Sequence, residues 1–198
     1  MGMHLETMIL GPLQTNCYLV WVEGSGRCAV IDPGDQGPMI LRRLNELGLR
    51  PEAILLTHGH FDHVGAVRAL HEATRCPVWL MEEELSLPER LTAGPLFYTD
   101  GYDPKEPVAA GGLTFRVLPT PGHTPGSVCL LTQDALFSGD TLFAGSCGRV
   151  DFSGGSGRQM LASLRKLRDL PYDGPVYPGH GEATTLARER AENPYLQD

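Results

Sequence analysis

The segment LLTHGHFDHVG, residues 55–65, constrains this chain more than any other and follows directly on an apolar run. It gathers His58, His60, Asp62 and His63 into six positions, although the whole chain holds only 7 histidines. His58 and His60 are two apart, so in extended chain they project to the same side, while the adjacent Asp62 and His63 point differently. This spacing favours a metal site over unrelated histidines, and one short loop of this kind can serve two neighbouring ions.

Two metal ions need more ligands than this loop supplies, and three further candidates each follow an apolar segment in a glycine-rich turn. They are His123 in PTPGHTPGS, Asp140 in LFSGDTLF and His180 in VYPGHGE. Glycine lets the backbone bend at such points, so that the side chain reaches inward. Taken together, these residues predict a site at strand ends. Nitrogen and carboxylate ligands without thiolate suit zinc, iron or manganese.

The pattern of apolar residues predicts an α/β chain. Strands are expected at residues 16–23, 27–34, 52–58, 77–81, 113–120, 127–133, 135–143 and 175–180. Helices are expected at 38–48, 64–75, 82–91, 159–170 and 182–193, the third of them weak and broken at Pro88, with loops and turns over 92–112. Strands with interspersed helices, in an order that occurs twice, indicate two sheets with helices outside.

Composition narrows the classes of partner. The net charge of −8 argues against a surface that wraps nucleic acid. No apolar run approaches a membrane span, and the N-terminus shows no signal-peptide pattern, so we expect neither a nucleic-acid nor a membrane partner. The five cysteines are scattered without a CxxC pair, which indicates free thiols in a reducing compartment and a cytoplasmic location.

The ordered set of residues resembles the metallo-β-lactamase superfamily. Its elements occur in sequence here: an aspartate in VIDPG (Asp32), then HGHFDH, then His123, Asp140 and His180. The resemblance covers nearly the whole chain. It implies a four-layer αβ/βα sandwich of metallo-β-lactamase type, with the site along one edge of two sheets.

The resemblance also implies a set of ligands for two divalent metal ions, zinc first, with iron or manganese as alternatives. The first ion would be held by His58, His60 and His123, the second by Asp62, His63 and His180, and both by Asp140. Asp32 would play a supporting or structural part instead of binding metal.

Within the superfamily, GDTLFAGSCGRVDFSGGS and PGHGEATTLARERAENPYLQD look like short bacterial glyoxalase II-like hydrolases. That implies cleavage of a thioester such as S-D-lactoylglutathione to a hydroxy acid and a thiol. A water that bridges two divalent cations loses a proton near neutral pH, and Asp62 is then the residue that orients the resulting hydroxide. Arg149 is the candidate contact for a glutathione carboxylate, the alternative being a loop salt bridge. Cys147 is interpreted as a packing residue.

Two other functions remain open on the residues alone. A persulfide dioxygenase would use one iron held by two histidines and an aspartate, and its ligands are retained here too. A nucleic-acid processing hydrolase can use the same ligands, although the acidic charge argues against it. The sequence ends about one helix after His180, so we expect residues 1–198 to form one domain, without the C-terminal helical domain of full-length glyoxalase II.

Overall fold

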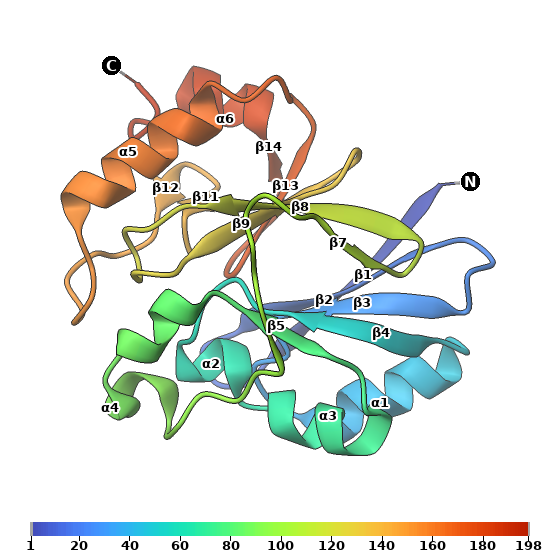
Figure 1. Cartoon of the computed structure of the whole chain (residues 1–198). Helices are drawn as coiled ribbons and strands as arrows, with labels where there is room; N and C mark the ends of the chain where they lie inside the picture. The colour runs from blue at the N-terminus through green and yellow to red at the C-terminus, as the bar shows by residue number, and fades with distance from the viewer. Residues whose placement is uncertain (1, 198) are drawn as a thin grey trace.

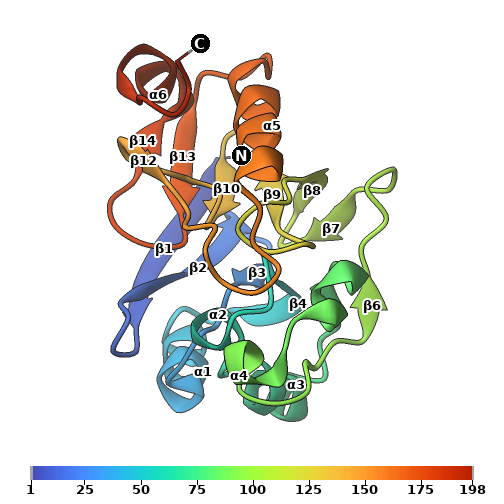
Figure 2. The same ribbon diagram turned by 90° about the vertical axis from the view of Figure 1, so that its left-hand side faces the viewer.

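Two six-stranded β-sheets face each other and carry helices on their outer sides in the computed structural model, which describes residues 2–197 (Figure 1). Helices α1 to α4 lie beyond the first sheet, and α5 and α6 lie beyond the second. The same layers are visible after a quarter turn (Figure 2). The four-layer αβ/βα sandwich expected from the sequence is confirmed.

The first sheet has the strand order β1-β2-β3-β4-β5-β6. Its strands are β1 (Met3–Leu10), β2 (Thr15–Val22), β3 (Arg27–Ile31), β4 (Arg50–Leu55), β5 (Val78–Leu80) and β6 (Asp100–Gly101). β1 to β3 pair antiparallel, whereas β3 to β6 run parallel. Its helices are α1 (Gly37–Glu46), α2 (Phe61–Val64), α3 (Val67–Thr74) and α4 (Glu89–Thr92), with a 3₁₀ helix at Glu82–Ser86. Ile40 and Leu44, one turn apart on α1, are buried in the cluster between helix and sheet.

The second sheet has the order β14-β13-β10-β9-β8-β7. Its strands are β7 (Val108–Ala110), β8 (Leu113–Pro119), β9 (Val128–Leu131), β10 (Leu136–Gly139), β13 (Pro175–Pro178) and β14 (Thr184–Thr185). A small hairpin joins β11 (Leu142–Phe143) to β12 (Ser146–Cys147). α5 (Gly157–Arg168) and α6 (Leu186–Glu192) cover the outer face, and the side chain of Ser156 caps the first turn of α5.

Between the sheets lies a core of apolar side chains from both inner faces, including the fully buried Phe115 and Phe137. The strands around this core end at a common edge. The segment after β4 carries His58 to His63, the loop between β8 and β9 carries His123, and Asp140 and His180 follow β10 and β13. An isolated bridge between Thr15 and His180 joins the two sheets at this edge. The fold therefore gathers at one place the residues that the sequence singled out.

Several boundaries differ from the expected ones. β1 was not expected, because Met3–Leu10 mixes polar with apolar residues and pairs with β2 alone. The loop expected over 92–112 contains β6 and β7, which are too short to show a period. The strand expected over 135–143 is broken at Asp140, and the last helix begins at Leu186 instead of residue 182 because β14 precedes it.

The helix expected over 64–75 is α3, which begins three residues later, at Val67. Val64 belongs instead to the short helix α2. The weak helix expected over 82–91 is a 3₁₀ helix and the one-turn α4, separated around Pro88. Among the described residues, no helix combines the length and the apolar character that crossing a membrane requires.

Candidate metal centre

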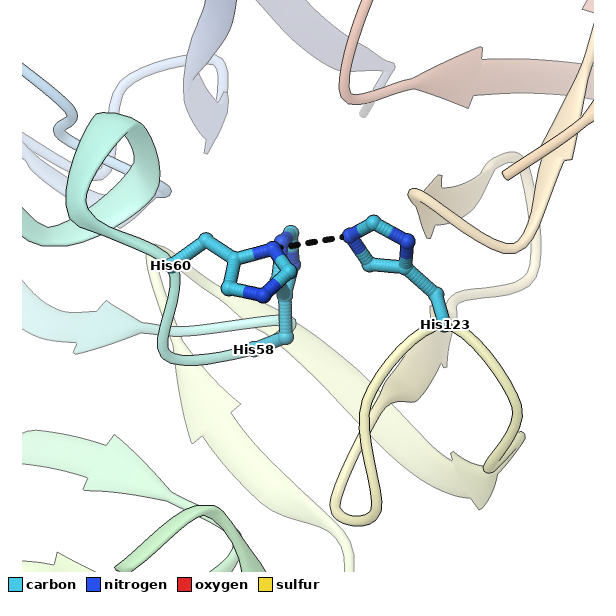
Figure 3. A group of neighbouring side chains, drawn as sticks. All are labelled: His58, His60 and His123. Atoms are coloured by element: carbon cyan, nitrogen blue, oxygen red, sulfur yellow. Dashed lines mark hydrogen bonds between the residues drawn. The ribbon is translucent and has the colours of Figure 1, made fainter. Parts of the chain in front are cut away.

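The first group of candidate ligands lies between the two sheets at their common edge. His58 and His60 come from the loop after β4, and His123 faces them from the loop between β8 and β9 (Figure 3). One ligand atom from each lies within 4.8 Å of the others, and His60 Nδ1 is 2.9 Å from His123 Nε2. We call these three residues the first trio; all are buried.

A second group lies beside the first and comprises Asp62, His63 and His180, which we call the second trio. Its ligand atoms also lie within 4.8 Å of one another. His180 Nε2 is 3.3 Å from His63 Nε2 and 3.2 Å from Asp62 Oδ2. His63 is buried, whereas the Asp62 and His180 side chains are 14% and 28% exposed. The second trio is the more accessible of the two.

Asp140 lies between the trios. Its Oδ2 is 3.4 Å from His123 Nε2 in the first trio and 3.6 Å from His180 Nε2 in the second. Its Oδ1 is 3.5 Å from His63 Nε2, is buried and has no hydrogen-bond partner. Two clusters of histidine and aspartate with a carboxylate between them are consistent with a dinuclear site.

The hydrogen bonds behind the histidines test whether a cation fits. The Nδ1 atoms of His63, His123 and His180 each face an oxygen that only accepts, and so carry the proton. These oxygens belong to the Asp32 carboxylate and to the carbonyls of Arg149 and Leu13. In the neutral rings the Nε2 lone pairs therefore point inward, at carboxylates and at one another. His58 Nε2 and His60 Nε2 are buried without any partner. Converging lone pairs and carboxylates suit a bound cation, so the residues fit divalent metal ions.

The two trios differ in electrostatics. Burial, with the neighbouring histidines, lowers the pKa of His58 and lowers that of His60 to about 4. Burial also lowers the pKa of His123. In the second trio burial acts in the same direction on His63, but the carboxylates of Asp140 and Asp32 outweigh it and raise its pKa to about 9.

The rest of the second trio follows the same rule. The pKa of His180 is raised because its hydrogen bond to Asp62 outweighs burial. Burial alone would raise the pKa of Asp62, but the hydrogen bond from His180 and the charge of His63 hold it below its usual range. The first trio is thus an environment for neutral ligands, whereas the second already stabilises positive charge.

Two glycines let the loops approach this closely. A Cβ atom at Gly179 would collide with Asp140 Oδ1 and with His63, so no larger residue fits beside the ligands. Gly139 has φ +49° and packs against Thr57, where a Cβ atom would lie 2.6 Å from the Thr57 Cβ. This agrees with the role that the sequence suggested for glycine beside Asp140 and His180.

Asp32 supports the ligands from behind, as the resemblance implied. It accepts hydrogen bonds from the backbone N–H of Thr57 at 2.8 Å, from Thr57 Oγ1 at 2.6 Å and from His63 Nδ1 at 2.9 Å. Thr57 Oγ1 also lies 3.1 Å from His58 Nδ1. Asp32, His58 and His63 could form a third ligand group by distance, but these bonds already occupy the carboxylate. Asp32 has φ +49°, an uncommon conformation for a non-glycine residue.

Three contributions were missed from the sequence. Thr15 Oγ1 donates to Asp62 Oδ2 at 2.8 Å, and Asn16 Nδ2 donates to the carbonyls of Pro178 and Gly181 on either side of His180. The ring of Phe152 packs edge-on against His60, with centroids 6.0 Å apart. Only tertiary structure brings these side chains to the site, and none carries a ligand-type motif.

Arg149 and Cys147 lie at the border of the site. The Arg149 guanidinium binds Asp151 through two hydrogen bonds of 2.7 and 2.8 Å and lies over the Phe152 ring, 3.8 Å from its centroid. The substrate contact predicted for Arg149 remains a prediction. Cys147 is half-buried against the cluster beneath α5, and burial raises the pKa of its thiol, which favours packing over nucleophilic chemistry. The expectation of free cysteines is confirmed.

Comparison with known proteins decides the family. The family described as Metallo-beta-lactamase superfamily matches residues 10–180. The chain belongs to this superfamily. Within it, hydroxyacylglutathione hydrolase GloC of Haemophilus influenzae is 35% identical, over 98% of each chain. Among solved structures, BLEG-1 B3 metallo-beta-lactamase is 38% identical with a TM-score of 0.88, covering 98% of this chain and all of its own. The di-iron-bound form of TTHA1623 is 42% identical with a TM-score of 0.85, covering 96% of this chain and all of its own.

Proposed function

We propose that this metal-dependent hydrolase of the metallo-beta-lactamase superfamily cleaves thioesters, with S-D-lactoylglutathione as the model substrate. The observation that carries the proposal is the pair of trios joined by Asp140, at an edge where Asp62 and His180 remain partly exposed. The similarity to hydroxyacylglutathione hydrolase GloC over 98% of each chain supports this substrate class.

In this proposal the first trio would hold one divalent ion, the second trio would hold another, and Asp140 would serve both. Two such ions supply a Lewis acid for the thioester carbonyl and lower the pKa of a coordinated water. Zinc is the first choice for these ligands, and iron or manganese also suit them. The di-iron form of TTHA1623 shows that a relative of this fold carries iron.

The protein's own groups orient the reactants. Asp62 stays ionised because its pKa is held low, and Thr15 fixes one of its oxygens, so the carboxylate orients the attacking water by accepting a hydrogen bond. Hydrogen bonds to the Arg149 carbonyl and to Asp32 hold the rings of His123 and His63 in the orientation that a metal ligand needs. No serine or cysteine nucleophile is required, which agrees with the raised pKa of Cys147.

Arg149 would take the carboxylate of a glutathione thioester in place of Asp151. Both side chains are more than half exposed, so their ion pair is screened by water and its exchange for a substrate carboxylate costs little. In this proposal the occupants of the site are a small anionic thioester and metal ions, and neither nucleic acid nor a membrane.

The test is an activity screen of purified protein whose metal content has been measured. Hydrolysis of S-D-lactoylglutathione is expected, with close to two ions per chain, and Asp140→Asn is the control for adventitious catalysis. Parallel assays use glutathione persulfide with oxygen uptake, a β-lactam and a phosphodiester. One tightly held iron with persulfide oxidation would replace the proposal by a dioxygenase. Failure of metal-loaded protein to cleave any thioester would refute it.

A further inference from the structure

A buried glutamate outside both trios joins the two loops that carry the first trio. Glu84 lies on the 3₁₀ helix Glu82–Ser86, and its side chain is fully buried, whereas its neighbours Glu82 and Glu83 are exposed. A carboxylate in such a place is costly unless each oxygen is hydrogen-bonded. Its two oxygens therefore indicate what it does.

Each oxygen of Glu84 accepts a backbone N–H from a different loop. Oε2 accepts from Gly59 at 2.6 Å, and Gly59 is the residue between His58 and His60. Oε1 accepts from Gly126 at 2.6 Å, in the loop that carries His123. One side chain thus spans the two loops that supply the first trio, through two short hydrogen bonds.

The glycines on either side are what make this contact possible. A Cβ atom at Gly126 would lie 2.9 Å from three atoms of Glu84, and one at Gly59 would lie 3.1 Å from Glu84 Oε2 and 2.9 Å from Leu96. All three distances are shorter than ordinary van der Waals contact. The glycine in HGHFDH is therefore explained in this chain by the approach of Glu84 and Leu96.

We propose that Glu84 is a positioning residue that fixes the separation of the His58–His60 loop from the His123 loop and thereby sets the affinity of the first metal site. The inference rests on the proposed metal centre but not on its substrate. No corresponding link from Glu84 to Asp62, His63 or His180 occurs among the hydrogen bonds of the described residues. The effect should therefore fall on the first trio.

Glu84→Gln tests the hydrogen bonds without changing the volume of the side chain, because glutamine has the same shape as glutamate. It keeps one accepting oxygen but presents an NH₂ group to the other backbone N–H, so one of the two loops loses its partner. Glu83→Gln, on the same 3₁₀ helix and exposed, is the matched control. Leu167→Ala, in the core beneath α5, is the control for a general loss of stability.

The readout is zinc binding, measured by competition with a chromophoric chelator, together with the ion count after dialysis. Glu84→Gln should lower the affinity for one of the two ions by about 10- to 100-fold, as substitutions behind metal ligands typically do. The affinity for the other ion should stay within about twofold of the wild-type value. Glu83→Gln and Leu167→Ala should keep both affinities. If Glu84→Gln does not fold, Gly126→Ala disturbs the same contact from the opposite loop and should give the same selective loss.

Two full-affinity ions in folded Glu84→Gln would overturn the inference. So would an equal loss of both ions that Leu167→Ala reproduces, since the role of Glu84 would then be merely structural. A wild-type chain that binds no ion refutes the metal centre and this inference together. A wild-type chain that binds two ions but cleaves no thioester refutes only the proposed substrate.

Discussion

The two trios are built from the same residue types but in different surroundings. The first is made of three buried histidines whose pKa values are lowered, and the ring of Phe152 packs against His60 among them. The second contains a carboxylate, Asp62, and is partly open to solvent, because the side chains of Asp62 and His180 are partly exposed. The first is held by two loops that Glu84 joins, whereas the second is supported by Thr15 and Asp32, which lie on β2 and directly after β3 in the first sheet.

The difference indicates a division of labour within one site. An ion held by the first trio would be shielded from solvent, because all three histidines are buried. The second trio combines a carboxylate with solvent access, which suits the side on which water and substrate enter. Asp140 Oδ2 lies within 3.6 Å of a ligand nitrogen in each trio, so substitutions there and in each trio separate the two roles.

The largest effect is expected from Asp140→Asn. The amide removes the negative charge that offsets two cations and turns an NH₂ group toward a ligand nitrogen. The affinity for both ions should therefore fall, and kcat/KM should fall by more than about 100-fold. Elemental analysis after dialysis and steady-state kinetics measure the two effects. An Asp140→Asn protein that keeps two ions and full activity would show that the trios function independently.

A smaller and one-sided effect is expected from His180→Ala. The first trio does not contain His180, so one ion should remain at wild-type affinity while the second is lost. His60→Ala should give the converse, with the second trio retained. Zinc titration of both variants decides the matter, and loss of both ions from each would mean that neither trio binds metal without the other.

Asp32→Asn tests the support behind the second trio. Asparagine tolerates positive φ well, so the backbone conformation at φ +49° should persist. The hydrogen bond to His63 Nδ1 is weakened, because an amide oxygen is a poorer acceptor than a carboxylate. We expect affinity for the second ion to fall by about 10-fold, measured in the same titration. Unchanged affinity for the second ion would mean that Asp32 stabilises only the loop at Thr57 and does not support the metal ligand His63.

A feature of the fold or the site can be predicted from the sequence when a short stretch of residues carries its pattern. The seven candidate ligands all lie in short motifs at strand ends, so their spacing and the superfamily resemblance predict from the sequence that they form one site. Their assignment to two ions remains a prediction for the titrations above. The inner strands, each with its own apolar run, were also placed within a few residues.

What escaped the sequence is set by tertiary contacts. Glu84 is one of three consecutive glutamates, and nothing local marks it as the buried one. Thr15 lies 47 residues before the carboxylate that it holds. β1 lacks an apolar run because it is an edge strand with one neighbour, and β6 and β7 are too short for a period. Such features follow from the fold and not from the local pattern.

The smallest effect concerns the border of the site. If Arg149 binds a substrate carboxylate, Arg149→Ala should raise KM for a glutathione thioester a few-fold with little change in kcat, because binding common to ground and transition state is lost. The His123 hydrogen bond should survive, since Arg149 accepts it through its backbone carbonyl. Asp151→Asn removes the competing carboxylate that now occupies the guanidinium, so KM should fall instead. Opposite shifts of KM in the two variants assign Arg149 to substrate binding. If neither variant changes KM, the pair only shapes the loop, and Arg149 does not bind the substrate carboxylate.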